Sequence, residues 1–589
     1  MHRLSAAVVA VWLAAMCLLA RPHQVGDASE YVAMAGRLAS GRPPAMTAEE
    51  MAAFTRAWAG STAGYELQSR QLDPLRGTDG RYDMPHSWVY PLIAVPGVWL
   101  ARLVGAGDPW GLVLLNVALV LAVLWLAVRR GAGPWTLTLL AGPLAWWIDK
   151  PISDLFIACL VALAALAWPA PLSIVLLGLA AAQNPALGVA AATFTLAAVA
   201  AEPARLRSRA WQVAVLVGVL LAALPAAYCL VRIGRITPLT VWTDTAVWPS
   251  WAAFAFPVLD LNLGFVPRFL PGALAMGLAM LAPAAWRVPG AIPGAVTMLL
   301  LLLAVSQQPS HNTGGHPDFS RYWLWVWPFA FPFLLAQDAS PTRGARLLGS
   351  CLLAAALAWS TMAFRMDRPE TYRYPTPLAA WVWRAHPGWS SPLPEAFAER
   401  TSHREPGLVP TSTPGCEKVL LANGAWPASC PPRADAPAGC LDGGVLCYAN
   451  RGADGTYTFE ELGRPAQSDL VVHDRTWPRA DDASRWVERA VRSGRAGEDG
   501  GVAQVRAIWG AAWRQSWVAA DGRMIVYVRD VGEAARMAVR HPRPVGIRVT
   551  TPDGHHSETT AAPGTDPTMI LLPPGAHVLV DISDGPTPR

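Results

Sequence analysis

An acidic residue directly outside the first hydrophobic segment is the first candidate for chemistry in this chain. Asp27 follows the apolar run Leu4 to Ala20, and the apolar residues at 31, 34, 35 and 38, with Arg37 off that face, predict a short amphipathic helix along a membrane surface. A carboxylate held there can accept a proton from a substrate hydroxyl, so we predict that Asp27 is catalytic. Asp27 is also suited to cap that helix, and the two roles are compatible.

A second candidate site is the polar interruption that follows Trp146 and Trp147. Asp149, Lys150 and Asp154 lie here between two apolar runs. Charges near a bilayer are costly to retain, which favours a functional role: Asp149 and Asp154 as catalytic carboxylates, and Lys150 as a contact for an anionic substrate. The alternative is a solvated turn at residues 149 and 150, with Asp154 as a helix cap.

The third candidate site is the segment 311–322, which leads into a late apolar run. Arg321 at the membrane entrance can hold a phosphate through two parallel hydrogen bonds, although a snorkelling arginine has the same sequence context. His86, His311 and His316 could help to bind a divalent metal, but their spacing matches no recognised ligand motif. The sequence therefore leaves a metal cofactor open.

The composition predicts a polytopic helical membrane protein. The chain has 589 residues, of which 53% are hydrophobic and 15% are charged, and its mean hydropathy is +0.28. The first apolar run lacks a convincing cleavage site and is read as a retained span. The formal charge of +5 comes from arginines scattered in short loops, so we expect membrane lipids and no nucleic acid as partners. Phosphate-binding loops and dinucleotide fingerprints are absent in a suitable context.

The topology depends on whether the apolar segment that begins after His86 crosses the membrane. If it is re-entrant or interfacial, Arg129, Arg130 and the later loop arginines fall on the cytoplasmic side, as the positive-inside rule prefers. We therefore predict about eleven spanning helices, with a large first outer loop at 22–109. Their expected bounds are Leu4 to Ala20, Trp110 to Val128, Pro134 to Ile148, Ile152 to Trp168, Leu172 to Ala182, Leu187 to Ala200, Ala210 to Val231, Leu270 to Trp286, Ile292 to Val305, Tyr322 to Leu335 and Arg346 to Phe364.

The chain after the last span is expected to be soluble and extracytoplasmic. A Pro-rich linker at 366–395 would connect the membrane domain, 1–365, to a mixed α/β or β-rich domain at 396–589. Four cysteines lie close together in that domain. No Cys-x-x-Cys pair supports zinc, so disulfides in an oxidising compartment are the better interpretation, with the pairing undetermined; these cysteines are Cys416, Cys430, Cys440 and Cys447.

Four features in order resemble the GT-C superfamily of membrane glycosyltransferases, which includes protein O-mannosyltransferases and aminoarabinose transferases. They are Asp27 with Tyr31 after the first span, the pair Tyr90-Pro91, an acid at 149 or 154, and the pair Arg321-Tyr322. The resemblance covers residues 1 to about 364. Gly26 stands where these families often have a second acid, a difference that bears on metal dependence.

The resemblance implies inverting transfer of a sugar from a polyprenyl-phosphate donor to an acceptor on the outer face of a bacterial inner membrane. The acceptor could be a glycan, a lipid or a protein. The residues expected to contact substrate are Tyr31, His86, Tyr90, Lys150, His316, Arg321 and Tyr322. Three alternatives are a transporter of a lipid-linked sugar, a membrane-anchored assembly protein that acts through its outer domain, and a glycan polymer ligase.

Overall fold

The computed structural model divides the chain into two compact units. The first comprises Met1–Glu66 and Leu72–Tyr372, and the second comprises Leu67–Gln71 and Arg373–Arg589. The structure describes residues 2–23, 27–58, 75–236, 251–307, 319–340, 342–363, 374–402 and 410–421, shorter stretches from 426 to 463, and six strands between 504 and 584.

The first unit is helical. In chain order its helices are α1 (His2–Leu19), α2 (Ala28–Ala39), α3 (Ala48–Trp58), α5 (Val89–Leu103), α6 (Pro109–Arg129), α7 (Pro134–Leu140), α8 (Ser153–Ala167), α9 (Leu172–Gln183), α10 (Gly188–Ala201), α11 (Arg209–Ile233), α12 (Trp251–Leu259), α13 (Phe265–Arg268), α14 (Leu270–Leu281), α15 (Ala291–Val305), α16 (Arg321–Leu324), α17 (Phe331–Asp338) and α18 (Arg343–Ala363). Among the described residues, three helices are long and apolar enough to cross a membrane: Pro109–Arg129, Arg209–Ile233 and Arg343–Met362. The unit is therefore that of a membrane-associated protein.

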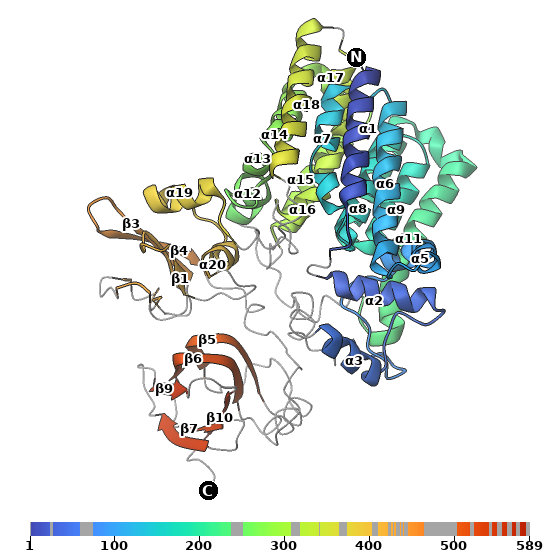
Figure 1. Ribbon diagram of the computed structural model, residues 1–589. Helices are drawn as coiled ribbons and strands as arrows, with labels where there is room; N and C mark the ends of the chain where they lie inside the picture. The colour runs from blue at the N-terminus through green and yellow to red at the C-terminus, as the bar shows by residue number, and fades with distance from the viewer. Residues whose placement is uncertain are drawn as a thin grey trace. The chain divides into compact units, whose positions relative to one another are not determined.

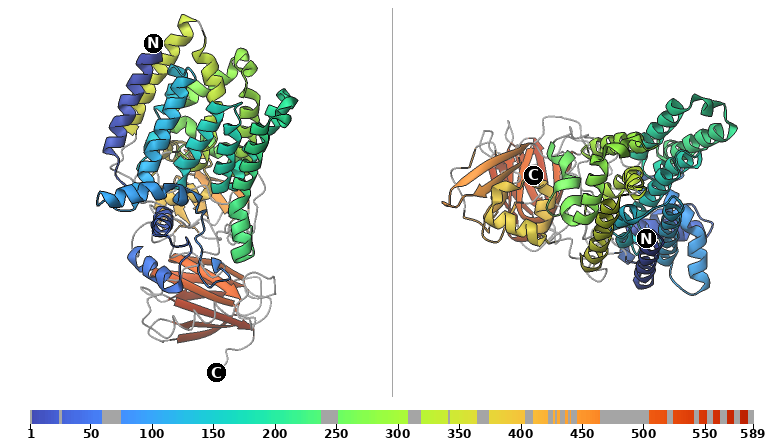
Figure 2. Two further views of the ribbon diagram at one scale, coloured as in Figure 1. Left: turned by 90° about the vertical axis from the view of Figure 1, so that its right-hand side faces the viewer. Right: turned by 90° about the horizontal axis from the view of Figure 1, so that it is seen from above.

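Two helices of the first outer segment lie across the bundle. α1 and α6 run alongside each other, whereas α2 lies across them near one end (Figure 1). Figure 1 views α5 nearly along its axis, and Figure 2 shows the same helices from two further sides. α5 therefore crosses α6 and does not continue the row of parallel helices, an arrangement that fits the expected interfacial helix. Its position relative to a membrane stays a prediction.

Glycines allow α5 and α6 to cross with their backbones in contact. A Cβ atom built on Gly97 of α5 would lie 2.4 Å from the carbonyl oxygen of Gly111 in α6. Gly178 of α9 approaches Gly218 of α11 in the same way, at 2.4 Å from its carbonyl oxygen. Small residues of this kind let apolar helices pack closely, and the first of these contacts holds α5, the helix that carries Tyr90, against α6.

Three of the expected spans are wrong as single helices. The first, expected at 134–148, ends as α7 at Leu140 and resumes as a 3₁₀ turn at Pro143–Trp147. The second, expected at 322–335, consists of α16, a 3₁₀ turn at Trp327–Ala330, and α17. The third, expected at 270–286, ends as α14 at Leu281 before a turn at Pro283–Arg287. Each break coincides with a proline, which lacks the N–H that an interior helical position must donate.

A polar break separates α9 from α10 at residues 183–185, where Gln183 is buried, Asn184 is partly exposed and Pro185 is exposed. Gln183 ends α9, and its side-chain oxygen accepts the backbone N–H of Tyr90 at 2.8 Å. Its amide nitrogen donates to the carbonyl oxygen of Ser87 at 3.3 Å, and the Asn184 side chain accepts from the N–H of Ala186 at 3.1 Å. The break therefore anchors the start of α5.

The second unit begins inside the segment that was expected to be a linker. From residue 374 onward, 366–395 contains α19 (Pro377–Ala385) and a 3₁₀ turn at Pro387–Trp389. α20 (Pro394–Ser402) follows, and Trp383 of α19 packs edge-on against Phe397 of α20 with ring centroids 4.8 Å apart. Proline at the first helical position favours α19, and the burial of Trp383 stabilises it, so a Pro-rich composition does not make this stretch a linker.

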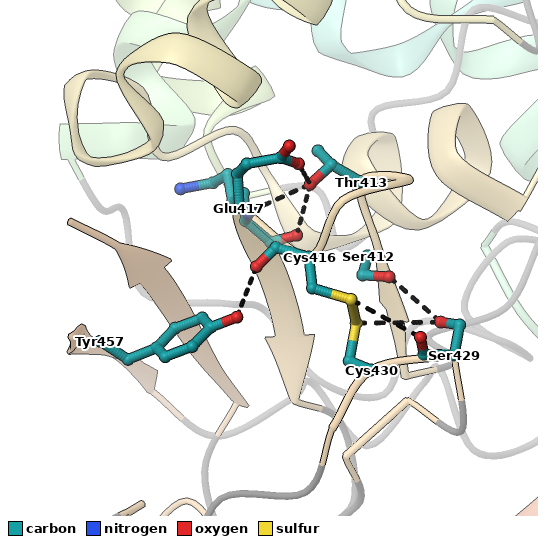
Figure 3. The surroundings of a disulfide bond; sticks show 8 residues. Ser412, Thr413, Cys416, Glu417, Ser429, Cys430 and Tyr457 are labelled. Carbon is teal, nitrogen blue, oxygen red and sulfur yellow. Dashed lines mark hydrogen bonds between the residues drawn. A yellow bond between two sulfur atoms is a disulfide. The ribbon is translucent and has the colours of Figure 1, made fainter. Parts of the chain in front are cut away.

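A four-stranded antiparallel sheet carries the cysteines. Its order is β1 (Thr411–Ser412), β2 (Lys418–Leu421), β3 (Leu446–Arg451) and β4 (Tyr457–Gly463). Disulfides join Cys416 to Cys430 and Cys440 to Cys447, with S–S distances of 2.05 and 2.03 Å, which confirms the prediction and supplies the pairing. Around the first bond, the Tyr457 hydroxyl donates to the carbonyl oxygen of Cys416 at 2.7 Å (Figure 3). The disulfides indicate an oxidising environment for this unit.

A second antiparallel sheet of six strands completes the described chain. Its order is β5-β6-β10-β7-β8, with β9 paired to β6. The strands are β5 (Gln504–Val518), β6 (Met524–Arg540), β7 (Val545–Thr550), β8 (His556–Ala561), β9 (Thr568–Leu572) and β10 (Val578–Asp584). Alternating apolar and polar residues at 418–421, 524–528, 546–550 and 577–582 predict strands, and these are found here and in the first sheet. The same reasoning predicts a strand at 470–472 and a helix at 484–493, which lie outside the described residues.

Candidate functional site

Asp27 occupies the cap position of α2 without using its side chain as a cap. Its backbone carbonyl accepts the N–H of Glu30 at 3.1 Å, but its carboxylate makes no capping hydrogen bond. Carboxylate oxygen Oδ2 instead lies 3.2 Å from Nη1 of Arg321 and 3.2 Å from Nε2 of His86. The carboxylate is therefore turned toward residues that lie 294 and 59 positions away in the chain.

His86 joins Asp27 to a second carboxylate. Its Nδ1 atom lies 2.9 Å from Oε2 of Glu30, whose side chain is 1% exposed. The segment before His86 is held by a β-bridge in which Met46 and Tyr82 exchange backbone hydrogen bonds of 2.9 and 2.7 Å. After it, the Ser87 hydroxyl donates to the carbonyl oxygen of Ala182 at 3.0 Å. The imidazole is thus positioned from both sides.

Arg321 enters the cluster from the first position of α16. The preceding residue, Ser320, donates its N–H to the carbonyl oxygen of Leu263 at 2.7 Å, which fixes the start of this short helix. The guanidinium lies over the ring of Tyr322 with 5.4 Å between its carbon and the ring centroid. Tyr322 therefore supports Arg321 through a cation–π contact, and this contact is the role its geometry supports.

Asp154 lies in the first turn of α8 and completes the group. It is 4% exposed and interacts electrostatically with Arg321, Asp27 and His86. The hydroxyl groups of Tyr31 and Ser153 lie 2.9 Å apart and join α2 to α8. Burial raises the pKa of Tyr31 well above its usual value, so its hydroxyl stays protonated and can donate. We call Asp27, Glu30, His86, Asp154 and Arg321 the charged cluster.

The charged cluster favours an ionised carboxylate at Asp27. Nη1 of Arg321 donates to one oxygen of that side chain, and Nε2 of His86 lies 3.2 Å from the same oxygen. A hydrogen bond from a guanidinium stabilises the charged form of a carboxylate. Such a group can accept a proton or stabilise a developing positive charge.

The residues fit a hydrogen-bonded cluster better than a metal site. Asp27, Glu30 and His86 each offer a ligand atom, and these atoms lie within 4.8 Å of one another. However, both ring nitrogens of His86 face carboxylates, so a metal would have to replace one of these contacts, and the Arg321 cation lies beside Asp27.

Asp149 and Lys150 form an ion pair with each other. Lys150 Nζ lies 2.5 Å from Oδ1 of Asp149, and both residues are 2% exposed, so the alternative of a solvated turn is wrong. Asn116 of α6 holds this loop by donating to the carbonyl oxygens of Ile148 and Lys150 at 3.3 and 2.8 Å. The Lys150 ammonium is thus occupied by its neighbour, which weakens the expectation that it contacts a substrate phosphate.

Tyr90 supports the cluster from α5. Its hydroxyl donates to Oδ1 of Asn116 at 3.1 Å, and its ring meets that of Tyr31 edge-on at 5.6 Å. Because Tyr90 is fully buried, it holds the loop and α2 in place. His311, His316 and Gly26 lie outside the described residues.

Glu30 is the member of the cluster that the sequence interpretation missed. It follows Asp27 by three residues, a spacing that places two side chains on one face of a helix start. The pattern Asp-x-x-Glu, followed later in the outer segment by a lone histidine, is the signal that could have found it. Comparison of this chain with protein-family models, with curated proteins and with solved structures found no match.

Proposed function

We propose that this protein is a membrane glycosyltransferase with a GT-C-like polytopic domain, which moves a sugar from a polyprenyl-phosphate donor to an acceptor hydroxyl. The reaction would take place on the periplasmic face of a bacterial inner membrane, with the second unit on the same side. The observation that best supports this proposal is that residues 27, 30, 86, 154 and 321 meet in one cluster, whose three carboxylates are buried, within a helical, membrane-associated unit. Buried ionisable groups gathered in this way favour a functional site.

The cluster supplies the two charges that the transfer requires. In the proposed step Asp27 takes the proton of the acceptor hydroxyl while the acceptor oxygen bonds to the anomeric carbon of the sugar. The bond from that carbon to the donor phosphate oxygen breaks, and the phosphate keeps the electron pair. Arg321 stabilises this negative charge through charge-assisted hydrogen bonds. Attack opposite the leaving group inverts the anomeric centre.

Two other buried polar residues of the described helical unit, Asp338 and Asn116, have structural partners, which favours an enzyme over a transporter. Asp338 accepts the backbone N–H groups of Trp135 and Thr136 at 3.0 Å and so satisfies the start of α7. Asn116 is occupied by the loop after Trp147. A transporter is expected to carry charges along a path through several spans, and these two residues do not form such a path.

The proposal is tested by measuring transfer of labelled sugar from polyprenyl phosphate by the purified protein in detergent, with a cell-envelope fraction as the source of acceptor. We expect Asp27→Asn and Arg321→Ala to lower the rate by at least about a hundredfold, the range typical for lost acid–base and electrostatic groups. Asp108→Asn, which removes one partner of the surface pair with Arg102, serves as the matched control. Undiminished transfer by Asp27→Asn, or no transfer by the wild type from any donor sugar, contradicts the proposal.

A further inference from the structure

Arg321, which is proposed to bind the donor phosphate, donates a hydrogen bond to Asp27, which is proposed to activate the acceptor. Arg321 Nη1 lies 3.2 Å from Asp27 Oδ2, with side-chain exposures of 18% and 8%. A phosphate oxygen and this carboxylate oxygen are chemically similar acceptors, and both prefer a guanidinium as donor. A lipid phosphate that enters the cluster therefore meets a resident anion already in contact with Arg321.

We propose that Asp27 and the lipid phosphate compete for Arg321, so that arrival of the donor releases the carboxylate that activates the acceptor. The inference rests on the proposed function and adds how its two half-sites are coupled. Without the lipid donor, one Asp27 oxygen accepts a hydrogen bond from Arg321 and lies beside Nε2 of His86, and the guanidinium makes the carboxylate a weak proton acceptor. When Arg321 turns to the phosphate, Asp27 loses this bond and its basicity rises.

His86 and Glu30 keep Asp27 in place during this exchange. His86 Nε2 contacts Asp27 and its Nδ1 contacts Glu30, so the carboxylate keeps its contact with the imidazole after Arg321 has moved. Asp154, its neighbour Trp325 and the Tyr31 hydroxyl are among the other described groups that face this region. None of them offers a positive charge, so among the described residues the exchange at Arg321 is the step by which phosphate would change the surroundings of Asp27.

The opposite arrangement is that Asp27 holds Arg321 in the geometry that phosphate needs. The two arrangements predict opposite effects of Asp27→Asn on phosphate binding. Competition predicts tighter binding, because the amide is neutral and neither repels the phosphate nor retains the guanidinium strongly. A lost charge-assisted hydrogen bond corresponds to roughly tenfold or more in a binding constant, and partial exposure keeps the estimate near the lower end.

The experiment measures binding of undecaprenyl phosphate to the full-length protein in detergent by tryptophan fluorescence, with inorganic phosphate in a parallel arm. We expect Asp27→Asn to bind the lipid about tenfold more tightly than the wild type, and Arg321→Met to bind it at least about tenfold more weakly.

Asp154→Asn removes a buried carboxylate of the same cluster that has no direct ion pair with Arg321 among the described contacts, and its effect on lipid binding is expected to be smaller. Asp27→Ser provides the same test if the asparagine variant does not fold. Saturable binding of inorganic phosphate would assign the site to the phosphate group, and binding of the lipid alone would show that the tail is needed.

Unchanged or weaker lipid binding by both Asp27 variants would overturn the inference and support positioning of Arg321 by Asp27. An equal gain in lipid affinity with Asp154→Asn would also overturn it, because the effect would then come from the general loss of negative charge. Lipid binding by Arg321→Met that matches the wild type is the third result that would overturn it. Failure of the proposed function is distinguishable, because wild-type protein would then neither bind undecaprenyl phosphate nor transfer sugar.

Discussion

Replacement of His86 tests the geometry of the charged cluster without reference to catalysis. His86 joins two buried carboxylates, and His86→Leu leaves Glu30 and Asp27 without this contact. Breaking a buried charged contact from one side costs about 3–5 kcal/mol, and the remaining contact between Asp27 and Arg321 places the expected loss near 3 kcal/mol. Glu30→Gln retains an acceptor for Nδ1 and should cost about 1 kcal/mol.

The double variant distinguishes a direct contact from two independent losses. In His86→Leu/Glu30→Gln the second carboxylate is neutral, so the free energy of unfolding should fall by about 1–2 kcal/mol less than the sum of the single losses. Equilibrium unfolding in mixed SDS and detergent micelles, followed by tryptophan fluorescence, gives the three differences. The same cycle on Arg102 and Asp108, an exposed pair, should show a coupling below about 1 kcal/mol. Additivity within about 0.5 kcal/mol at His86 and Glu30 would refute the reasoning.

Three further predictions concern the surroundings of the site and the second unit. The hydrogen bond from Arg37 lowers the pKa of Glu50 to about 2. The pair therefore adds roughly 1 kcal/mol to the stability of the fold above the usual pKa near 4.5, and this stabilisation is lost as the pH falls toward 2. Hydrogen exchange in α2 and α3 should rise over that pH range in the wild type and should already be high in Glu50→Gln. Gly97→Val should lower the free energy of unfolding by about 3 kcal/mol, because the valine side chain would collide with the α6 backbone. Gly277→Val in α14 has no atom within 4 Å of the new Cβ and should lower it by less than about 1 kcal/mol. Similar losses of stability for both variants would contradict the crossing of α5 and α6. Cys430→Ser opens a 14-residue loop and should destabilise its sheet by about 3 kcal/mol, and peptide mapping without reductant should recover the 416–430 and 440–447 pairs, with any other pairing as the refuting result.

The fold was predictable where hydrophobic runs are uninterrupted. The apolar runs at 110–128, 210–231 and 346–364 correspond to α6, α11 and α18, because long apolar segments satisfy their backbone groups as helices. The runs around 134–148 and 322–335 also read as apolar, but Pro143 and Pro328 break them into short pieces. Average hydrophobicity hides these breaks. The Pro-rich segment before 395 shows the converse, since apolar residues that pack on one another make α19 a helix.

The site was predictable in part because charge near an apolar segment is rare. Asp27, Asp154 and Arg321 stand out in the sequence for this reason, and the structure brings them together. Asp149 and Lys150 stand out equally, yet they neutralise each other in a buried loop. Sequence spacing cannot separate these cases, because both show charges between apolar runs. Arg37 was misjudged in the same way: it is buried, donates to the carbonyl oxygens of Pro43 and Ala45, and pairs with Glu50.

The partner of each carboxylate is what separates a structural charge from a candidate reactive one. Asp338 accepts two backbone N–H groups, and Asp149 pairs with its own neighbour in sequence, so both are satisfied by local structure. Asp27 stands where a carboxylate would ordinarily cap its helix, but it contacts groups from two distant segments instead. A helix start gains about 1 kcal/mol from a side-chain cap. The Asp27 carboxylate gives up this stabilisation, and its contacts with His86 and Arg321 in the proposed reaction account for the loss.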